Sequence, residues 1–245
     1  PGGGITANNT SAAILLDSDG AVDLNGFVVS GGQVNLVQNA AGETTGYSLT
    51  RHDGSASLAV TSDRQIKVGQ EIYAGRILTL NAGQAAAVTG VDYSGIGIVV
   101  TGSGTLRTGS ANSSTTLSSA SGIRLLATAG TAAPTYSIYA PGAGSAITLQ
   151  SALNQTAASE FRIDSTIFAA GNITTQASPV GNTVSKLAVS ASGKLESQSG
   201  NISAGGSESI TVDGSLLAST GSISVISTAN TIVGSTGQLN AQAAI

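Results

Sequence analysis

Paired carboxylates are the residues whose spacing could do chemistry, because a general acid and a general base flank the bond that a polysaccharide-degrading enzyme cuts. Of the thirteen acidic residues, only two pairs lie close enough in sequence to converge, Asp53 with Asp63 and Glu160 with Asp164. Arginine lies close to each pair, which is more typical of surface ion pairs. We therefore expect no enzyme activity and no catalytic residue, and a polysaccharide-degrading enzyme is the alternative.

The other side chains that could do chemistry are few. His52 is the single histidine, and a lone histidine beside a turn is usually a surface residue even when an aspartate could orient it. The chain has no cysteine, which excludes disulfides, thiolate metal sites and cysteine nucleophiles. Asp17, Asp19 and Asp23 are clustered like calcium ligands, but the downstream bidentate glutamate of a helix–loop–helix site is missing. We interpret them as a turn and expect no metal and no cofactor.

Composition narrows the class of protein. The net charge of −4 argues against nucleic-acid binding, which needs clustered lysine and arginine. The 40% hydrophobic content and mean hydropathy of +0.24 argue against disorder. No apolar run reaches the roughly 18 residues of a membrane span, and no signal-peptide pattern is present. Because the chain contains no methionine, we expect it to be a piece of a longer polypeptide with any export signal upstream.

A short unit recurs between Ser192 and Gln242, in which a glycine is followed two residues later by an aliphatic residue and then by small polar residues. The units are Gly193/Leu195, Gly200/Ile202, Gly214/Leu216, Gly221/Ile223 and Gly237/Leu239. Equivalent units recur about every 21 to 23 residues, a period typical of a solenoid whose coils are made of short β-strands. The pattern predicts an all-β chain folded as one continuous parallel β-helix of roughly eleven coils.

The alternation within each unit also predicts the register. Aliphatic residues alternate with Ser, Thr or Ala, so the aliphatic side chains share one face of each strand. No coil can bury this row alone, and Leu195, Leu216 and Leu239 should therefore stack on one another, as should Ile202 and Ile223. Ser215 and Ser222 should face outward. We expect each glycine to supply the backbone freedom of a tight corner.

The chain divides into three regions of one β-helix, residues 1–245. Residues 1–42 have the pattern of plain coils, and 181–245 hold the regular repeats. Residues 43–180 keep the rhythm but carry longer and more varied segments, which predicts coils decorated with loops, often the binding face of a solenoid. The expected insertions are residues 41–56, 61–76, 89–97 and 130–146. Residues 152–161 could form a short helix.

The stretch from Gly200 to Val225 resembles the filamentous-haemagglutinin repeats of bacterial two-partner secretion exoproteins. These include large adhesins and the toxin-delivery proteins of contact-dependent growth inhibition. The resemblance implies a right-handed parallel β-helix, secreted through an outer-membrane transporter and displayed at the bacterial cell surface, with a role in virulence or competition. In the toxin-delivery members, a region in the middle of the filament recognises a receptor on a neighbouring cell.

We therefore expect an adhesion or receptor-binding segment, and a passive structural stalk is a further alternative. The partner would be an outer-membrane protein, or a surface glycan or lipopolysaccharide, and the segment itself monomeric. Binding energy concentrates in Tyr, Trp and Arg, and the chain has no Trp. The predicted contact residues are Tyr47, Arg51, His52, Arg64, Tyr73, Arg76, Tyr93, Arg107, Tyr136 and Tyr139. The opposite interpretation is that these side chains only support the coils.

Overall fold

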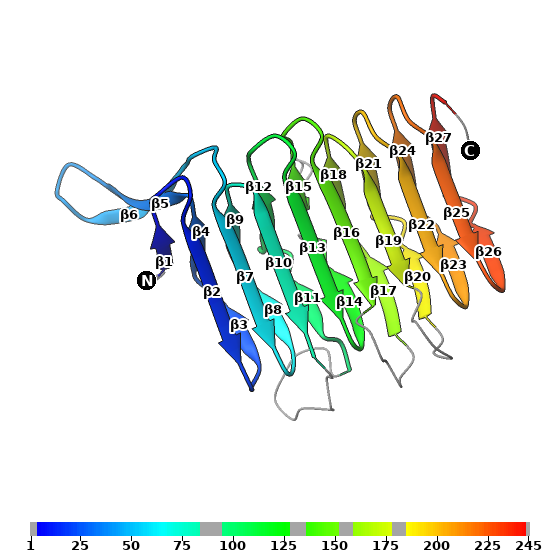
Figure 1. Ribbon diagram of the computed structural model, residues 1–245, viewed down its shortest axis with the longest axis horizontal. Helices are drawn as coiled ribbons and strands as arrows, with labels where there is room; N and C mark the ends of the chain where they lie inside the picture. Colours follow the sequence, from blue (N-terminus) through cyan, green and yellow to red (C-terminus); the bar gives the residue numbers. More distant parts are fainter. Residues whose placement is uncertain (1–3, 84–94, 128–135, 152–158, 178–184, 244–245) are drawn as a thin grey trace.

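The computed structural model describes residues 4–83, 95–127, 136–151, 159–177 and 185–243, and every regular element in these ranges is a β-strand. The strands form three long parallel sheets that lie side by side along a rod (Figure 1). Each coil of the chain adds one strand to each sheet in turn. The prediction of an all-β parallel β-helix is confirmed. No helix able to cross a membrane occurs in the described ranges.

The three sheets, here named A, B and C, are parallel throughout and are not closed. Sheet A has nine strands: β1 (Gly4–Ala7), β4 (Phe27–Ser30), β9 (Glu71–Ala74), β12 (Thr105–Thr108), β15 (Tyr136–Ala140), β18 (Thr166–Ala169), β21 (Lys194–Ser197), β24 (Ser215–Ala218) and β27 (Gln238–Ala241). Sheet B has eight: β2 (Ala13–Ser18), β7 (Ser57–Ser62), β10 (Ile77–Ala82), β13 (Ser114–Ser119), β16 (Ala146–Ser151), β19 (Ile173–Ala177), β22 (Ile202–Gly206) and β25 (Ile223–Ser227). Sheet C also has eight: β3 (Val22–Leu24), β8 (Ile66–Val68), β11 (Ile98–Val100), β14 (Gly122–Leu125), β17 (Ser159–Ile163), β20 (Ser185–Val189), β23 (Ser209–Val212) and β26 (Asn230–Val233).

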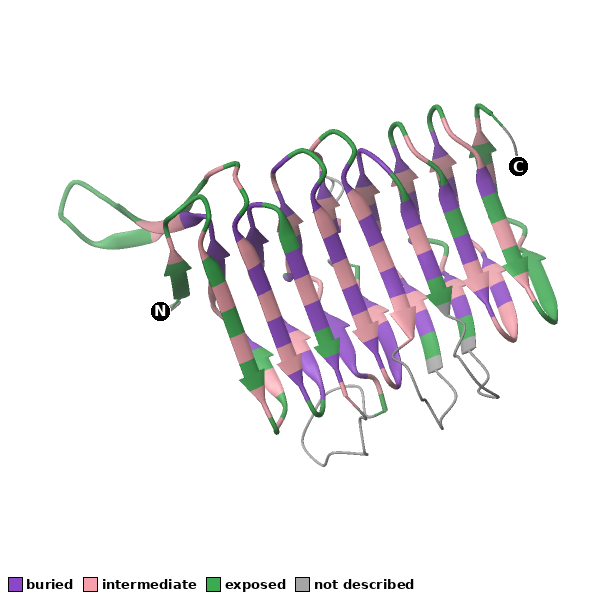
Figure 2. Cartoon of the chain, viewed as in Figure 1, coloured by how far each residue is buried: buried purple, intermediate pink, exposed green. Residues whose placement is uncertain are grey.

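Alternate side chains of each strand point into the rod. β12 and β24, for example, alternate between half-buried and buried residues, and the same stripes run along most strands of Figure 2. The buried rows are mostly leucine, isoleucine, valine and alanine, with Thr115 and Thr175 among them, and the apolar side chains join into one continuous core along the axis. Phe161, in sheet C, is the one aromatic side chain among the described residues that belongs to this core. A narrow aliphatic core therefore holds the coils together.

The register predicted for the C-terminal repeats is confirmed. Leu216 pairs with Leu195 on one side and with Leu239 on the other, and Ile202 pairs with Ile223. Leu195 and Leu216 are fully buried, whereas Ser215 lies half-buried on the outward side of β24. The simple alternation was enough to assign these strands because consecutive coils have nearly equal lengths here.

The predicted number of coils is wrong. The sheets have eight or nine strands rather than about eleven, because coils in the middle are longer than 22 residues. Leu78 and Ile98 are 20 residues apart, close to the predicted period, but they belong to different sheets: Leu78 stacks on Leu58 and Thr115, and Ile98 on Ile66 and Ile123. Spacing alone cannot separate two strands of one coil from equivalent strands of two coils once the corners vary in length.

Of the predicted insertions, one is present, one is absent, and the others lie partly outside the described ranges. Residues 41–56 do contain an insertion, an antiparallel hairpin formed by β5 (Gly32–Gln38) and β6 (Thr44–Arg51), which starts within the stretch expected to be plain. Residues 61–76 are not an insertion, because they form the end of β7, the strands β8 and β9, and their corners. Residues 89–94, 130–135 and 152–158 lie outside the described ranges, and Ser159–Phe161 of the expected helix are part of β17.

The repeat glycines serve close packing between coils. None of Gly193, Gly214 or Gly237 has a positive φ. Instead, a Cβ added to Gly214 would overlap the backbone carbonyl oxygens of Gly193 and Ser190 in the preceding coil. The conformational freedom expected of these glycines is therefore the wrong reason for their presence. These three corners need glycine because the backbone of the preceding coil lies too close for any side chain.

Replacing Leu216 by aspartate should destabilise the protein by more than about 4 kcal/mol, because an unpaired carboxylate would be buried between two coils. Ser215→Asp is the matched control, one residue away on the outward side and in register with Lys194. It should change stability by less than about 0.5 kcal/mol. Urea unfolding followed by circular dichroism measures both, and equal losses would show that the assigned register is wrong.

Replacing Gly214 by alanine should cost about 3 kcal/mol or more, because the added methyl group has no space against the neighbouring backbone. Gly46→Ala in β6 is the control, since nothing lies within 4 Å of an added Cβ there and its φ is not positive. Thermal unfolding of the two variants shows whether position 214 needs glycine for close packing or for backbone flexibility. A glycine needed only for flexibility would make Gly214→Ala as mild as Gly46→Ala.

Candidate functional site

The β5–β6 hairpin leaves the rod at the corner between β4 of sheet A and β7 of sheet B, and it projects at the N-terminal end (Figure 1). Gly31 turns the chain outward with a φ of +83°, a conformation that favours glycine. The two arms are tied at their base, where the His52 backbone N–H donates to the carbonyl oxygen of Gly31 at 2.8 Å. The hairpin thus interrupts a corner and leaves the stacking of the three sheets intact.

The hairpin has one apolar side and one polar side. Val34 pairs with Leu49 and Leu36 with Tyr47 on the apolar side, and the Tyr47 ring lies 5.9 Å from the ring of Phe27 on sheet A. Leu36 is nevertheless 61% exposed. The polar side carries a short network in which Gln33 donates to Asn35, and Asn35 to Thr50. The apolar side therefore continues the outward surface of sheet A beyond the coils.

Tyr73 was predicted to contact a partner, and this prediction is wrong. Its side chain points outward from β9 but is fully buried, and its hydroxyl donates to the carbonyl oxygen of His52 at 3.1 Å. A Cβ on Gly109 would lie 2.5 Å from that hydroxyl, so glycine there leaves room for the ring. Burial raises the pKa of Tyr73, and the Asp53 carboxylate raises it further. Tyr73 thus anchors the base of the hairpin to sheet A.

Arg51 makes a second anchor between the hairpin and sheet A. Its Nε and Nη2 atoms each donate to one carboxylate oxygen of Glu71 in β9 at 2.7 Å, a bidentate geometry that fixes both side chains. His52 is half-buried, and its Nε2 lies 3.2 Å from Asn8 Oδ1 in the turn after β1. Both side chains are therefore engaged in holding the hairpin.

Three aromatic rings pack together on the outward side of sheet A. Tyr139 of β15 stacks on Phe168 of β18 at 5.3 Å, and Tyr136 lies 4.7 Å from Tyr139 and 6.0 Å from Phe168. The guanidinium group of Arg107 lies over the Tyr139 ring, 4.7 Å from its centre. All four side chains remain half-exposed. They form the largest group of aromatic and cationic side chains that is open to solvent in the described part of the chain.

We name the outward side of sheet A, together with the apolar side of the hairpin, the aromatic face. Its members are Phe27, Tyr47, Arg107, Tyr136, Tyr139 and Phe168. The chain has five tyrosines and three phenylalanines, and all of those in the described ranges lie on or under this face except Phe161. The register explains the arrangement, since Tyr73, Arg107, Tyr139 and Phe168 occupy one outward row of consecutive coils.

The remaining predicted contact residues do not join this face. Arg64 is exposed in the corner after β7, and Arg76 is exposed in the corner before β10. Tyr93 lies outside the described residues. The structure thus brings together Tyr47, Arg107, Tyr136 and Tyr139 from the predicted set.

Sequence reasoning missed Phe27, Phe168 and Glu71 as members or supports of the face. Phe168 could have been found by aligning β18 with β15, because it falls two residues before the corner in the same way that Tyr139 does. The correspondence between Phe168 and Tyr139 was missed because the coil boundaries in the middle of the chain were assigned incorrectly.

The outward side of sheet B differs from the aromatic face, because small hydroxyl side chains dominate it. One row of consecutive coils is formed by Ala59, Thr79, Thr116, Thr148, Thr174 and Ser203. Larger apolar residues appear singly, at Leu15, Ile77 and Ile226. Such a surface offers little area for anchoring a partner.

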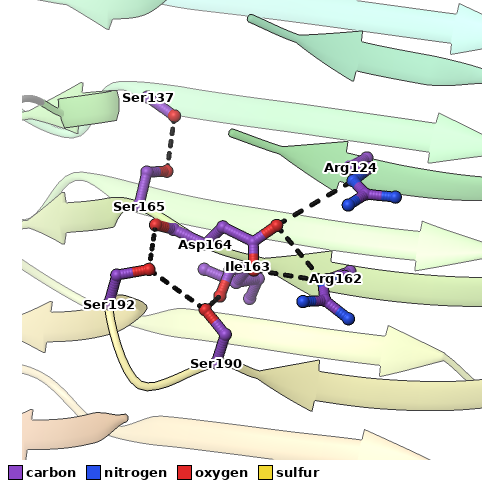
Figure 3. Close-up of polar contacts among 8 residues, drawn as sticks. All are labelled: Arg124, Ser137, Arg162, Ile163, Asp164, Ser165, Ser190 and Ser192. Carbon is purple, nitrogen blue, oxygen red and sulfur yellow. Dashed lines mark hydrogen bonds and ion pairs between the residues drawn. The ribbon is translucent and has the colours of Figure 1, made fainter. Parts of the chain in front are cut away.

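The outward side of sheet C is charged but largely neutralised. Arg124 and Arg162 are neighbours in register, and the Asp164 carboxylate lies between them, 3.1 Å from Arg162 Nε and 3.9 Å from Arg124 Nε (Figure 3). Ser192 donates to the backbone carbonyl of Asp164, and Ser190 to that of Ile163. This cluster ties one corner to the next.

The predicted carboxylate pairs are not arranged as general acid and base. Asp53 precedes β7 and Asp63 follows it, so the two lie at opposite ends of a six-residue strand. Asp164 is held by two arginines, as expected of a surface ion pair, while Glu160 pairs in register with Lys186. In the described residues, no three acidic or histidine side chains lie close enough together to hold a metal ion.

A small pocket of about 230 Å³ lies at the N-terminal end of the rod, beside Phe27. It is lined by backbone and side chains of β1, β4 and the corner between β3 and β4. Asp23 is the one titratable side chain in its lining.

Comparisons with protein-family models, with curated proteins and with solved structures found no match. The fold and the site together define the class of the protein as a parallel β-solenoid that carries a projecting hairpin and an aromatic surface on one of its three sheets.

The raised pKa of Tyr73 predicts a loss of stability at alkaline pH. In the unfolded chain this tyrosine ionises near its ordinary pKa of 10.0, whereas in the folded protein it stays neutral to higher pH. Its stabilising contribution is complete below pH 10 and is lost as the pH rises through the folded-state value. Tyr73→Phe should be less stable than the parent at pH 8, by about 1 kcal/mol for the lost hydrogen bond. The difference should shrink as the pH rises above 10 in urea unfolding, and a constant difference would contradict the assignment.

Proposed function

We propose that this chain is a receptor-binding segment of a secreted bacterial filament, and that its aromatic face contacts a molecule on the surface of another cell. The observation that carries the proposal is the asymmetry of the rod. Large aromatic and cationic side chains gather on sheet A and the hairpin, while sheet B presents mainly small hydroxyl groups and sheet C neutralised charges.

This asymmetry is not needed for folding. The core is aliphatic and continuous without the outward side chains of sheet A, and the C-terminal coils are built with few large residues outside. Exposed aromatic residues cost solubility unless they serve an interface, and tyrosine and arginine supply most of the energy at such interfaces. The resemblance of Gly200–Val225 to filamentous-haemagglutinin repeats supports a place at the bacterial surface, with a target cell as the partner.

The face is also rigid, which favours binding. Each of its members on sheet A sits on a strand hydrogen-bonded on both sides, and the hairpin is anchored by Tyr73 and by the Arg51–Glu71 pair. A partner would meet side chains already held in place, so little conformational entropy is lost on binding.

Removing the aromatic cluster should abolish binding to target cells. The fluorescent 245-residue chain is added to a panel of Gram-negative bacteria and binding is measured by flow cytometry. The Tyr139→Ser/Phe168→Ser double variant should bind at least about tenfold more weakly than the parent, because hot-spot truncations commonly cost this much.

The matched control is Thr148→Ser/Thr174→Ser on the outward side of sheet B, which also changes two neighbouring coils. It should bind like the parent, and thermal unfolding must show all three proteins folded. Equal binding by the parent and the aromatic variant, or binding by the parent to no member of the panel, would overturn the proposed function.

A further inference from the structure

We propose that the partner is a protein, and that it presents a carboxylate side chain to Arg107 at the centre of the aromatic face. This inference rests on the proposed function and identifies the chemistry of the partner at the same site.

Arg107 is the one cation among the named members of the aromatic face, and it forms no ion pair with an acidic side chain of the described residues. Arg51 is paired with Glu71, and Lys194 of β21 lies 2.7 Å from Glu196. Arg107 instead lies between the buried Tyr73 and the half-exposed Tyr139 in its row, and its guanidinium group stacks on the Tyr139 ring. A positive charge is thus held against an aromatic ring without an ion pair of its own, and the carboxylates of Glu71 and Asp53 lie beside its row neighbour Tyr73.

The way in which Arg107 is held leaves it able to bind. Stacking on Tyr139 uses the flat surface of the guanidinium group, while the N–H donors lie around its edge. A carboxylate can accept two parallel hydrogen bonds from that edge, which is the strongest pairing that arginine makes. Because the ring already fixes the guanidinium plane, less rotamer freedom is lost when such a pair forms. The aromatic rings around it would exclude water from the pair.

The arrangement of the rings favours a protein over a sugar. A sugar that binds through an aromatic residue lies flat against an open ring surface. Here Arg107 covers one side of Tyr139 and Phe168 covers the other, so this ring presents its edge and hydroxyl outward. The pocket described above lies at the end of the rod beside Phe27, whereas Arg107 is on β12, two strands further along the sheet than β4. A cluster of aromatic side chains around an arginine matches the composition of protein–protein contacts.

The experiment measures binding of the 245-residue chain to the responsive cells, using intact cells, cells shaved with proteinase K and cells oxidised with periodate. Shaving should remove binding, and periodate should leave it unchanged. Arg107→Gln should reduce binding about tenfold, and Arg107→Lys should recover only part of it, since lysine keeps the charge but loses the fork geometry. Arg76→Gln, which removes an exposed arginine from a corner outside the face, is the matched control and should bind normally.

Three outcomes would overturn this inference, and the first two would leave the proposed function standing. One is loss of binding after periodate with retention after shaving, which would identify a glycan. Another is normal binding by Arg107→Gln while the Tyr139/Phe168 variant fails, which would make Arg107 a support for the ring. The third is a concentration-dependent dimer in sedimentation that Arg107→Glu dissociates, which would identify a second copy of this chain as the occupant.

Discussion

The structure depends on one constraint, the stacking of each coil directly on the preceding one at the spacing of hydrogen-bonded strands. Every residue of a strand then lies against its counterpart in the next coil, so side chains form rows along the axis. Inside the rod, the rows are mainly aliphatic. At the corners, the same spacing brings backbone against backbone, and for this reason Gly214 cannot carry a Cβ.

The same constraint operates on the outside of the rod. An outward residue is surrounded by its two row neighbours, so a single aromatic side chain is partly covered and a run of them becomes a packed surface. Tyr139 illustrates this, since Arg107 precedes it and Phe168 follows it in the row. The stacking that buries the core therefore also orders the aromatic face.

The regular part of the fold could be predicted from the sequence, and the middle could not. Nearly equal coil lengths after Ser192 allowed the pairing of Leu195 with Leu216 to be predicted. Corners of unequal length before it hide the coil boundaries, so the spacing of Leu78 and Ile98 does not show that they lie on different sheets. Tyr73 and Tyr139 show how far the candidate site could be predicted from the sequence. Both occupy the same outward row, yet Tyr73 is fully buried because the base of the hairpin covers it. Nothing in the residues around Tyr73 indicates that a segment returning at His52 would close over it.

A stacked solenoid can acquire function in two ways without disturbing its core, and this chain uses both. Corners can change length, because only the strands must stay in register; the hairpin enters at one corner, and β4 still pairs directly with β9 beyond it. Outward rows can change identity, because their side chains do not contribute to the buried core, as the shift from Thr148 on sheet B to Tyr139 on sheet A shows. The two ways meet at β9, where Tyr73 donates its hydrogen bond to the hairpin and Glu71 holds Arg51. A change in that one strand would therefore move the hairpin relative to the rest of the aromatic face without loosening the coils, which separates the stability of the rod from the geometry of its surface.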